Sequence, residues 1–484
     1  MKNPINRRDA LFGSLALSLG ASLSGCSAPS SGILPSAAKL SPRPNFLFLP
    51  IDDLNDWIGV LGTNDDVKTP NIDALANQGV LFENAYAQEP ICGPSRASLM
   101  SGLYPHQTGI YGQVADSSLR DAIGAVSGAN FMTEYLRDNG YYAAGRGKIF
   151  HNAAPQGTFD DFAREGEFGP KPPNRMAWDS NRTHTDWGPF PETDSEMLDY
   201  KTARWGEEWL SQKRDYPFFL GLGMVRPHAP WHVPQKWFDM YPLEDITLPP
   251  WLEDDADDLP ERAKSLTDVP QMPSIEWAIE NNEWRPILQA YLASITFVDH
   301  CIGIAVDALA RSEYADNTYI ILFSDNGYHL GEKSRFAKMS LWERSTRIPL
   351  IVTGPGISPK RIDAPVGLID LYPTIIELSG LPRKPENAGH SLLPFLTGDG
   401  EARDPVTSVY GKDNFAVSDG RYKYIRYDNG EEELYDLQSD PHEWTNVAGD
   451  LEYRKDRDRL AAFIPLETQD AIIVDPNSTR IKPK

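Results

Sequence analysis

Polar side chains that could bind an ion or move a proton follow four short apolar runs of the sequence. They are Asp52 and Asp53, Lys148 and His151, Arg226 and His228, and Asp325 and Asn326. Taken one at a time, such residues are more often found in turns, helix caps or ordinary surface positions. Their repetition at the same kind of position, just after an apolar run, favours one shared site.

Four of these residues offer oxygen ligands only. Asp52, Asp53 and Asp325 supply three carboxylates, and Asn326 supplies an amide carbonyl. This set suits a hard divalent cation, since Ca²⁺ accepts about six to eight oxygen ligands in flexible geometry. Zinc is less suited, because it normally takes thiolate or imidazole ligands. Without a cation the clustered carboxylates would repel one another, so the sequence predicts a Ca²⁺ site, with Mg²⁺ as the less favoured ion.

The order of these runs predicts the elements that position the site. Short apolar runs alternate with helical patterns, which is typical of an α/β protein with a mostly parallel central sheet flanked by helices. In such a sheet the carboxyl ends of the strands gather along one edge, where ligands bind. Residues 364–381 have helical apolar spacing. After residue 405, the alternation in FAVSDG and YKYIRYD predicts an antiparallel sheet, followed by a helix around 450–464.

The first 43 residues are predicted to direct the chain to its location. Arg7 and Arg8 precede the apolar run 10–23, the pattern of a twin-arginine export signal. The run is shorter than the ~20 apolar residues of a membrane-spanning helix. It ends in LSGC, which resembles the bacterial lipobox. We expect an export signal over 1–26, a lipid anchor at Cys26 as the one membrane contact, and a flexible tether over 27–43. The protein would then be a periplasmic or surface lipoprotein of a bacterium, or, alternatively, a soluble periplasmic protein cleaved nearby.

The net charge limits the class of partner, and the cysteine content limits the expected covalent links. A net charge of −23 argues against a nucleic-acid partner. It leaves room for an anionic small substrate, because a few basic residues in one cleft create a local positive field. Cys301 lies in a helical apolar pattern and is expected to be buried, so a disulfide framework is not expected. With Cys26 assigned to the lipid, Cys92 remains for a special role.

The stretch CGPSRASLMSG at 92–102 resembles the signature of the type I sulfatases, in which the motif cysteine is oxidised to formylglycine. The resemblance covers nearly the whole mature chain, from PNFLFLPIDDLNDW at 44–57 to ELYDLQSDPHEWTNVAG at 433–449. The spacing of GKIFH, MVRPHAPW and SDNGYHLGEKSRFAKMSLWE is similar to the iduronate-2-sulfatase-like branch and its bacterial polysaccharide sulfatases. One departure is Asn326, where iduronate-2-sulfatase has His, which leaves the exact substrate open.

This resemblance implies an alkaline-phosphatase-like fold, with a catalytic domain over 44–404 and a smaller C-terminal α+β subdomain over 405–484. It also implies a role for each matching residue. Arg96 would hold the formylglycine, His151 would act as a base, and Lys148, Lys338 and His228 would contact the substrate, with His228 protonating the departing alcohol. The hydrated formylglycine would be the nucleophile. The implied calcium ligands are Asp52, Asp53, Asp325, Asn326 and the modified Cys92.

The activity implied is hydrolysis of sulfate esters of a carbohydrate, after a formylglycine-generating or equivalent maturation enzyme has modified Cys92. Two alternatives are a phosphonate or phosphate ester hydrolase of the same superfamily and an inactive surface lipoprotein that binds sulfated glycans. The segment 153–200 is interpreted either as a loop over the cleft that could bind sugars or as a surface insertion. His329 is a candidate for supporting the site or facing the substrate.

Overall fold

The computed structural model describes residues 43–164, 166, 168–180, 183–398, 400 and 402–472. These residues belong to the compact unit that begins at Pro42. The predicted export signal and the anchor cysteine Cys26 lie outside the described residues, as does the tether up to residue 42.

A nine-stranded mixed sheet forms the centre of this unit, in the order β4-β3-β5-β1-β6-β7-β2-β8 with β9 beside β2. The strands are β1 Asn45–Ile51, β2 Val80–Tyr86, β3 Tyr142–Gly147, β4 Asp161–Ala163, β5 Phe218–Gly223, β6 Thr318–Ser324, β7 Arg347–Thr353, β8 Lys360–Ile362 and β9 Val366–Gly367. β7 runs antiparallel to its neighbours β6 and β2, and the other pairs are parallel. The predicted α/β class with a mostly parallel sheet is confirmed.

The central strand β1 shows why the sequence forms such a sheet. Successive side chains of a strand point to opposite faces. Phe46 and Phe48 therefore join one hydrophobic cluster, and Leu47 and Leu49 join the other. All four side chains are fully buried. A strand that is buried on both faces is apolar along its whole length, as NFLFLPI is.

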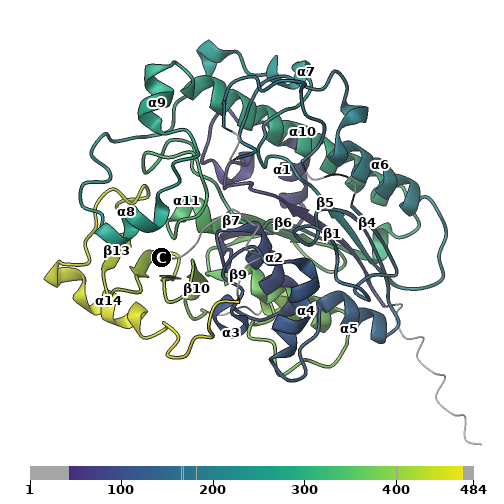
Figure 1. Ribbon diagram of the computed structural model, residues 1–484. Coiled ribbons are helices and arrows are strands. Elements are labelled where there is room, and N and C mark those ends of the chain that lie inside the picture. Colours follow the sequence, from purple (N-terminus) through teal and green to yellow (C-terminus); the bar gives the residue numbers. More distant parts are fainter. Residues whose placement is uncertain are drawn as a thin grey trace, which may run out of the picture. The chain divides into compact units, whose positions relative to one another are not determined.

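Helices cover the two faces of the sheet (Figure 1). One face carries α1 Pro70–Ala76, α6 Leu198–Leu210, α7 Gln235–Phe238, α9 Ile275–Glu280 and α10 Trp284–Ala310. The other carries α2 Cys92–Ser101, α4 Asp116–Gly124, α5 Met132–Asp138, α12 Leu371–Leu378 and α13 Leu393–Thr397. Other helices are α3 Pro105–Thr108, α8 Glu261–Thr267 and α11 Glu343–Thr346. The helices of the two layers turn apolar residues inward.

Helix α10 is the longest helix of the described chain and passes through one of the two cores. It is long and apolar enough to cross a membrane, but 78% of its most apolar window is buried inside the protein. Cys301 lies on this helix and is fully buried, and neither it nor Cys92 forms a disulfide. The predicted burial of Cys301 is confirmed, and α10 is the core helix of the fold.

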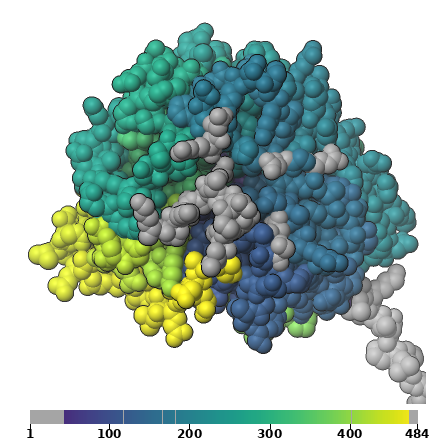
Figure 2. All heavy atoms as spheres, viewed as in Figure 1, coloured from purple at the N-terminus to yellow at the C-terminus, as the bar shows by residue number. Residues whose placement is uncertain are grey.

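A second, antiparallel sheet follows near the C-terminus. It consists of β10 Val406–Val409, β11 Phe415–Ser418, β12 Tyr422–Arg426 and β13 Glu432–Asp436, in that order. Helix α14, Arg454–Ala461, packs Leu460 against it, and this region is the yellow part of the surface in Figure 2. The predicted antiparallel sheet and closing helix are confirmed, whereas the boundary between residues 404 and 405 stays a prediction.

The helix expected over 364–381 is shorter than its apolar spacing suggested. Val366 and Gly367 pair with β2, and only 371–378 form α12. Between them, the Asp370 carboxylate accepts a hydrogen bond from the Gly367 backbone N–H at 2.8 Å. Pairing with β2 satisfies the backbone groups that a longer helix would have used.

The ends of β3 and β5 approach each other closely where the chain delivers Lys148. The Lys148 N–H donates to the Gly223 carbonyl oxygen at 3.0 Å. A Cβ added at Gly223 would lie 2.1 Å from the Lys148 carbonyl oxygen. Only glycine fits at this position without moving Lys148.

We expect Gly223→Ala to lower the free energy of unfolding by about 1–3 kcal/mol, because the added methyl group overlaps backbone that cannot yield. Chemical denaturation measures this change. Gly124→Ala is the matched control, since a Cβ there meets no atom of the described chain within 4 Å and alanine favours the helix. Equal stability of the two variants would contradict the close approach.

Candidate functional site

The structure brings the predicted residues together at the carboxyl ends of four adjacent strands. Asp52 and Asp53 follow β1, Lys148 follows β3, and His228 lies in the loop after β5. Asp325 and Asn326 follow β6 in the same way. The Asp52, Cys92 and His228 side chains have ligand atoms within 4.8 Å of one another. The predicted convergence at one sheet edge is therefore observed.

The signature stretch forms the whole of α2 and the glycine that ends it, and its first turns are fixed to this edge. Cys92 opens the helix and is 2% exposed. One turn later, the Ser95 hydroxyl donates to the Asp325 carbonyl oxygen at 2.6 Å, and Arg96 Nε donates to Asp325 Oδ2 at 2.6 Å. Arg96 Nη1 also donates to the carbonyl oxygens of Lys148 and Ile149. These bonds hold the start of α2, and with it Cys92, against the ends of β3 and β6.

The oxygen cluster fits a hard divalent cation. Carboxylate oxygens of Asp52, Asp53 and Asp325 lie within 4.8 Å of one another. Three buried oxygens, Asp52 Oδ1, Asp53 Oδ2 and Asn326 Oδ1, have no hydrogen-bond partner among the residues that the structure describes. Asn326 Nδ2 donates to Asp53 Oδ1 at 2.8 Å, which fixes the orientation of the amide. Buried oxygens without donors are the ligands that such an ion takes.

Burial and nearby charges shift the pKa values of the Asp52 and Asp325 carboxyl groups in opposite directions. Burial raises the pKa of Asp325 well above its ordinary value in spite of Arg96, and Asp52 adds to the rise. Burial would also raise the pKa of Asp52, but Lys148, His228 and Lys338 lower it below its ordinary value. A divalent cation would keep all three carboxylates ionised, so the electrostatics agree with the unpartnered oxygens.

Two buried lysines flank Cys92. Lys148 Nζ forms an ion pair with Asp52, and Lys338 Nζ forms one with Asp53. Lys338 Nζ is also 3.5 Å from Cys92 Sγ. Burial would raise the pKa of the Cys92 thiol, but Lys148, Lys338 and His151 lower it well below its ordinary value. The surroundings of residue 92 therefore favour a negatively charged side chain at that position.

The two predicted histidines occupy different electrostatic settings. His228 Nδ1 lies 2.5 Å from the Ala229 carbonyl oxygen, which can only accept, so Nδ1 carries a proton and Nε2 faces Asp53 Oδ2 at 3.6 Å. Burial lowers the pKa of His151, although Cys92 acts in the opposite direction. His228 can donate a proton from Nε2 when it is charged, and His151 is suited to accepting one.

Sequence reasoning missed two residues at the site. Gln113 Nε2 donates to Cys92 Sγ at 3.4 Å, and a Cβ on Gly93 would lie 1.9 Å from Gln113 Oε1. Phe168 stacks on the His228 ring with centroids 4.5 Å apart. Gln113 belongs to none of the sequence motifs described above. Phe168 belongs to the segment 153–200, so part of that segment does reach the site.

Arg226 and His329 have supporting positions. Arg226 is buried and donates to the carbonyl oxygens of Phe168, His228 and His232 at 2.9, 3.1 and 3.2 Å. It therefore joins the loop after β5 to Phe168. His329 is buried, and its Nε2 forms a hydrogen bond with the Ser340 hydroxyl at 2.9 Å. It therefore contacts the segment that carries Lys338.

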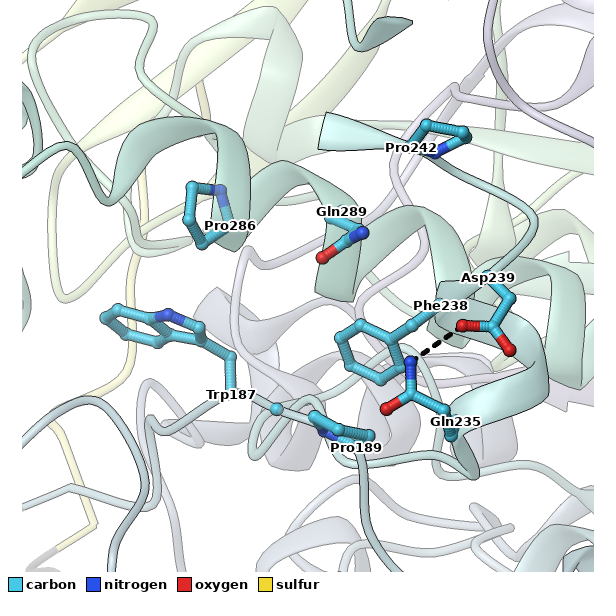
Figure 3. Close-up of a pocket in the computed structure, with 9 residues that line it drawn as sticks. Trp187, Pro189, Gln235, Phe238, Asp239, Pro242, Pro286 and Gln289 are labelled. Atoms are coloured by element: carbon cyan, nitrogen blue, oxygen red, sulfur yellow. Dashed lines mark hydrogen bonds between the residues drawn. The ribbon is translucent and has the colours of Figure 1, made fainter. Parts of the chain in front are cut away.

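Another part of the segment 153–200 lines a cavity away from the predicted residues. Trp187 and Pro189 form it together with α7 and α10, and its volume is about 420 Å³ (Figure 3). Gln235 Nε2 donates to Asp239 Oδ1 at 2.8 Å across its edge. None of the predicted site residues lines this cavity. The segment thus contributes Phe168 to the site and Trp187 to a separate hollow.

Comparison with known proteins finds relatives over most of the chain. The sulfatase family model matches residues 44–381, and a model of the C-terminal region of N-sulphoglucosamine sulphohydrolase matches residues 331–467. A sulfatase of Formosa agariphila is 45% identical over 438 residues, which cover 87% of this chain and 86% of the relative. The iduronate 2-sulfatase of Homo sapiens is 30% identical over 402 residues, covering 72% and 71%.

Solved structures share the fold. A protein in complex with its substrate, D-glucosamine-2-N,6-O-disulfate, has a TM-score of 0.68 and 22% identity, covering 87% of this chain and 96% of its own. A 2-O GAG sulfatase has a TM-score of 0.64 and 25% identity, covering 87% and 90%. The phosphonate monoester hydrolase of Agrobacterium radiobacter has a TM-score of 0.68 and 23% identity, covering 87% and 94%.

The oxygen cluster generates a test of cation binding. We expect Asp52→Asn to weaken the binding of a divalent cation at least about tenfold, because one carboxylate charge and its free oxygen are altered. The rise in Tm on adding Ca²⁺ or Mg²⁺ to chelator-treated protein measures this. Asp299→Asn, another buried aspartate, which bonds the first turn of α1, is the control and should leave the rise unchanged. No rise in Tm with either ion would contradict a cation site.

Proposed function

Because the chain belongs to the sulfatase family and is a sulfuric ester hydrolase, we propose that it removes sulfate from a carbohydrate by means of Ca²⁺ and a formylglycine made from Cys92. The observation that carries this proposal is the position of Cys92, buried between two lysines beside a cluster of oxygen ligands. The carbohydrate is supported by two similar structures, one in complex with a sulfated glucosamine and one of a GAG sulfatase.

Formylglycine and the cation would occupy positions that the chain already prepares. Hydrated formylglycine supplies a nucleophilic oxygen together with a second hydroxyl group, and Ca²⁺ supplies positive charge beside both. Asp52, Asp53, Asp325 and Asn326 would hold the ion. The number of these oxygens and their spread over two strand ends support Ca²⁺ over the smaller Mg²⁺, which demands a tighter octahedron.

The lysines and histidines then have separate tasks. Lys148 and Lys338 would place their ammonium groups against the sulfate oxygens, where negative charge is concentrated during transfer. His228, charged and held through Nδ1, would donate the Nε2 proton to the oxygen of the departing alcohol. His151 would accept a proton from residue 92. Arg96, engaged by Asp325 and two carbonyl groups, would keep residue 92 in place.

The burial of Cys92 bears on its maturation. A side chain that is 2% exposed cannot enter the active site of another enzyme. The maturation enzyme would therefore act before the chain folds. Because the twin-arginine pattern at Arg7 and Arg8 is typical of proteins exported in the folded state, we place this step in the cytoplasm. Export would then bring the protein to the periplasm or the cell surface, held by a lipid on Cys26.

Mass spectrometry tests these modifications directly. We expect the peptide that contains residue 92 to carry formylglycine in the exported protein, and Cys92→Ala to abolish hydrolysis of sulfate esters while retaining the rise in Tm with Ca²⁺. The same spectra report whether the mature N-terminus is a lipid-modified Cys26. Full activity with only unmodified Cys92 would refute the role of formylglycine.

A phosphonate or phosphate ester hydrolase is the second candidate. It is favoured by the structural likeness to the phosphonate monoester hydrolase, and tetrahedral oxyanions share much of their chemistry. Turnover of an aryl sulfate, an aryl phosphate and a phosphonate monoester by one enzyme preparation separates the two. Higher kcat/KM on the phosphonate than on the sulfate would reverse our assignment.

The role of His228 predicts a dependence on the leaving group. We expect His228→Asn to lower kcat about 10²- to 10⁴-fold on a sugar sulfate, because an alkoxide leaves poorly without a proton. The loss should be much smaller on nitrophenyl sulfate, whose phenolate leaves unprotonated. His300→Asn, on α10 beside Trp237, is the control and should change neither rate. Equal losses on both substrates would exclude His228 as the proton donor.

A further inference from the structure

Arg335 differs from the other buried cations of the described chain. Five of them pair with a carboxylate: Arg96 with Asp325, Lys148 with Asp52, Lys333 with Asp255, Lys338 with Asp53 and Lys423 with Glu343. Arg226 forms no ion pair with a described residue, and its guanidinium donates to three carbonyl groups. Arg335 is 7% exposed and forms no ion pair with any residue that the structure describes.

The hydrogen bonds of Arg335 are also incomplete. Its guanidinium donates through Nη2 to the Lys338 carbonyl oxygen at 3.1 Å, and its buried Nε has no partner in the described part of the chain. The Trp342 ring lies 5.9 Å from the guanidinium carbon, which offers a weak cation–π contact. A guanidinium can donate five hydrogen bonds, and one of them goes to an acceptor in the described chain.

Arg335 lies beside the catalytic site. It is bonded to the backbone of Lys338, whose Nζ lies 3.5 Å from Cys92 Sγ. The Tyr328 hydroxyl donates to the carbonyl oxygen of Phe336, the residue after Arg335, at 2.9 Å. The segment from Arg335 to Lys338 is therefore fixed beside the strand end that carries Asn326.

The backbone before Arg335 is held in a costly conformation. Lys333 and Ser334 have φ values of 52° and 55°, in the left-handed region that such residues rarely adopt. Lys333 Nζ is fixed by Asp255 at 2.6 Å and by the Glu443 carbonyl oxygen. Strained residues persist where the surroundings impose them, and they cluster at functional sites. The fold thus supports Arg335 firmly at this position.

We propose that Arg335 forms a second anion subsite, so that the preferred substrate carries another negative group near the sulfate that is removed. The group would be an oxyanion, either a carboxylate or a second sulfate, because the planar guanidinium donates to two such oxygens at once. No described carboxylate forms an ion pair with Arg335, although Asp268 acts on it from a greater distance, and the substrate would supply the nearer negative charge. This inference rests on the proposed function and extends it to the substrate class.

Matched disaccharide substrates test the subsite. The first carries one sulfate and is otherwise neutral, the second adds a carboxylate on the neighbouring sugar, and the third adds a second sulfate instead. We expect the wild-type enzyme to have a kcat/KM at least about tenfold higher on the second or the third than on the first, as a charge-assisted hydrogen bond predicts. Which of the two is preferred identifies the oxyanion.

Two variants assign the preference to Arg335. Arg335→Gln should raise KM about tenfold on the preferred substrate and change kcat/KM on the neutral monosulfate far less. Arg335→Lys should restore only part of the loss, because an ammonium group keeps the charge but lacks the paired donors. The neutral monosulfate is the internal control for folding and for formylglycine content. An equal rise in KM on all three substrates would mean that Arg335 only supports Lys338, and the proposal would fail.

Two further results separate this proposal from the proposed function. If the wild-type enzyme shows no preference among the three substrates, the subsite is refuted even where Arg335→Gln does not fold. If no sulfate ester is hydrolysed, the proposed function fails. Calorimetric binding of the three disaccharides to Cys92→Ala still decides the subsite, because equal affinities would refute it and tighter binding of a dianion would support it.

Discussion

The buried ion pair between Arg96 and Asp325 joins the parts from which the site is built. Removing two charges from water costs several kcal/mol, which their mutual attraction and further hydrogen bonds offset. Asp325 Oδ1 accepts from the Asp53 N–H at 3.2 Å, and Arg96 Nη1 donates to the carbonyl oxygens of Lys148 and Ile149. One interaction thereby fixes the start of α2 against the ends of β1, β3 and β6.

The charge balance of the site follows from this arrangement. Three acidic side chains, Asp52, Asp53 and Asp325, face three basic ones, Arg96, Lys148 and Lys338. A divalent cation added to this neutral set makes it positive, which favours a sulfate group. A protein with a net charge of −23 can therefore attract an anion at one place, because the local field is set by the nearest charges.

The small C-terminal sheet contributes to the site from a distance. The segment that carries Lys338 and Arg335 has little regular structure of its own. It is tied to the C-terminal region where Trp342 Nε1 donates to Glu433 Oε2 at 2.8 Å and the Glu343 N–H donates to Glu443 Oε2 at 2.8 Å. These bonds are buried or nearly so. The antiparallel sheet therefore helps to position a lysine that acts at the other sheet.

The sequence by itself determined the fold class and most of the site, because both leave local signals. Runs such as NFLFLPI must be strands buried on both faces, and the polar residues that end them must gather at one edge of a parallel sheet. Cys92 and Arg96 were identified differently, by the resemblance of CGPSR to a sulfatase signature, and their roles stay predictions. Only the tertiary structure decided which side chains remain without partners and which distant residues touch the site. Gln113 and Phe168 owe their places to contacts with other segments of the chain, and no local pattern encodes such contacts. Arg335 lacks an ion pair among the described residues because of the side chains that the fold brings near it, which no local pattern encodes either.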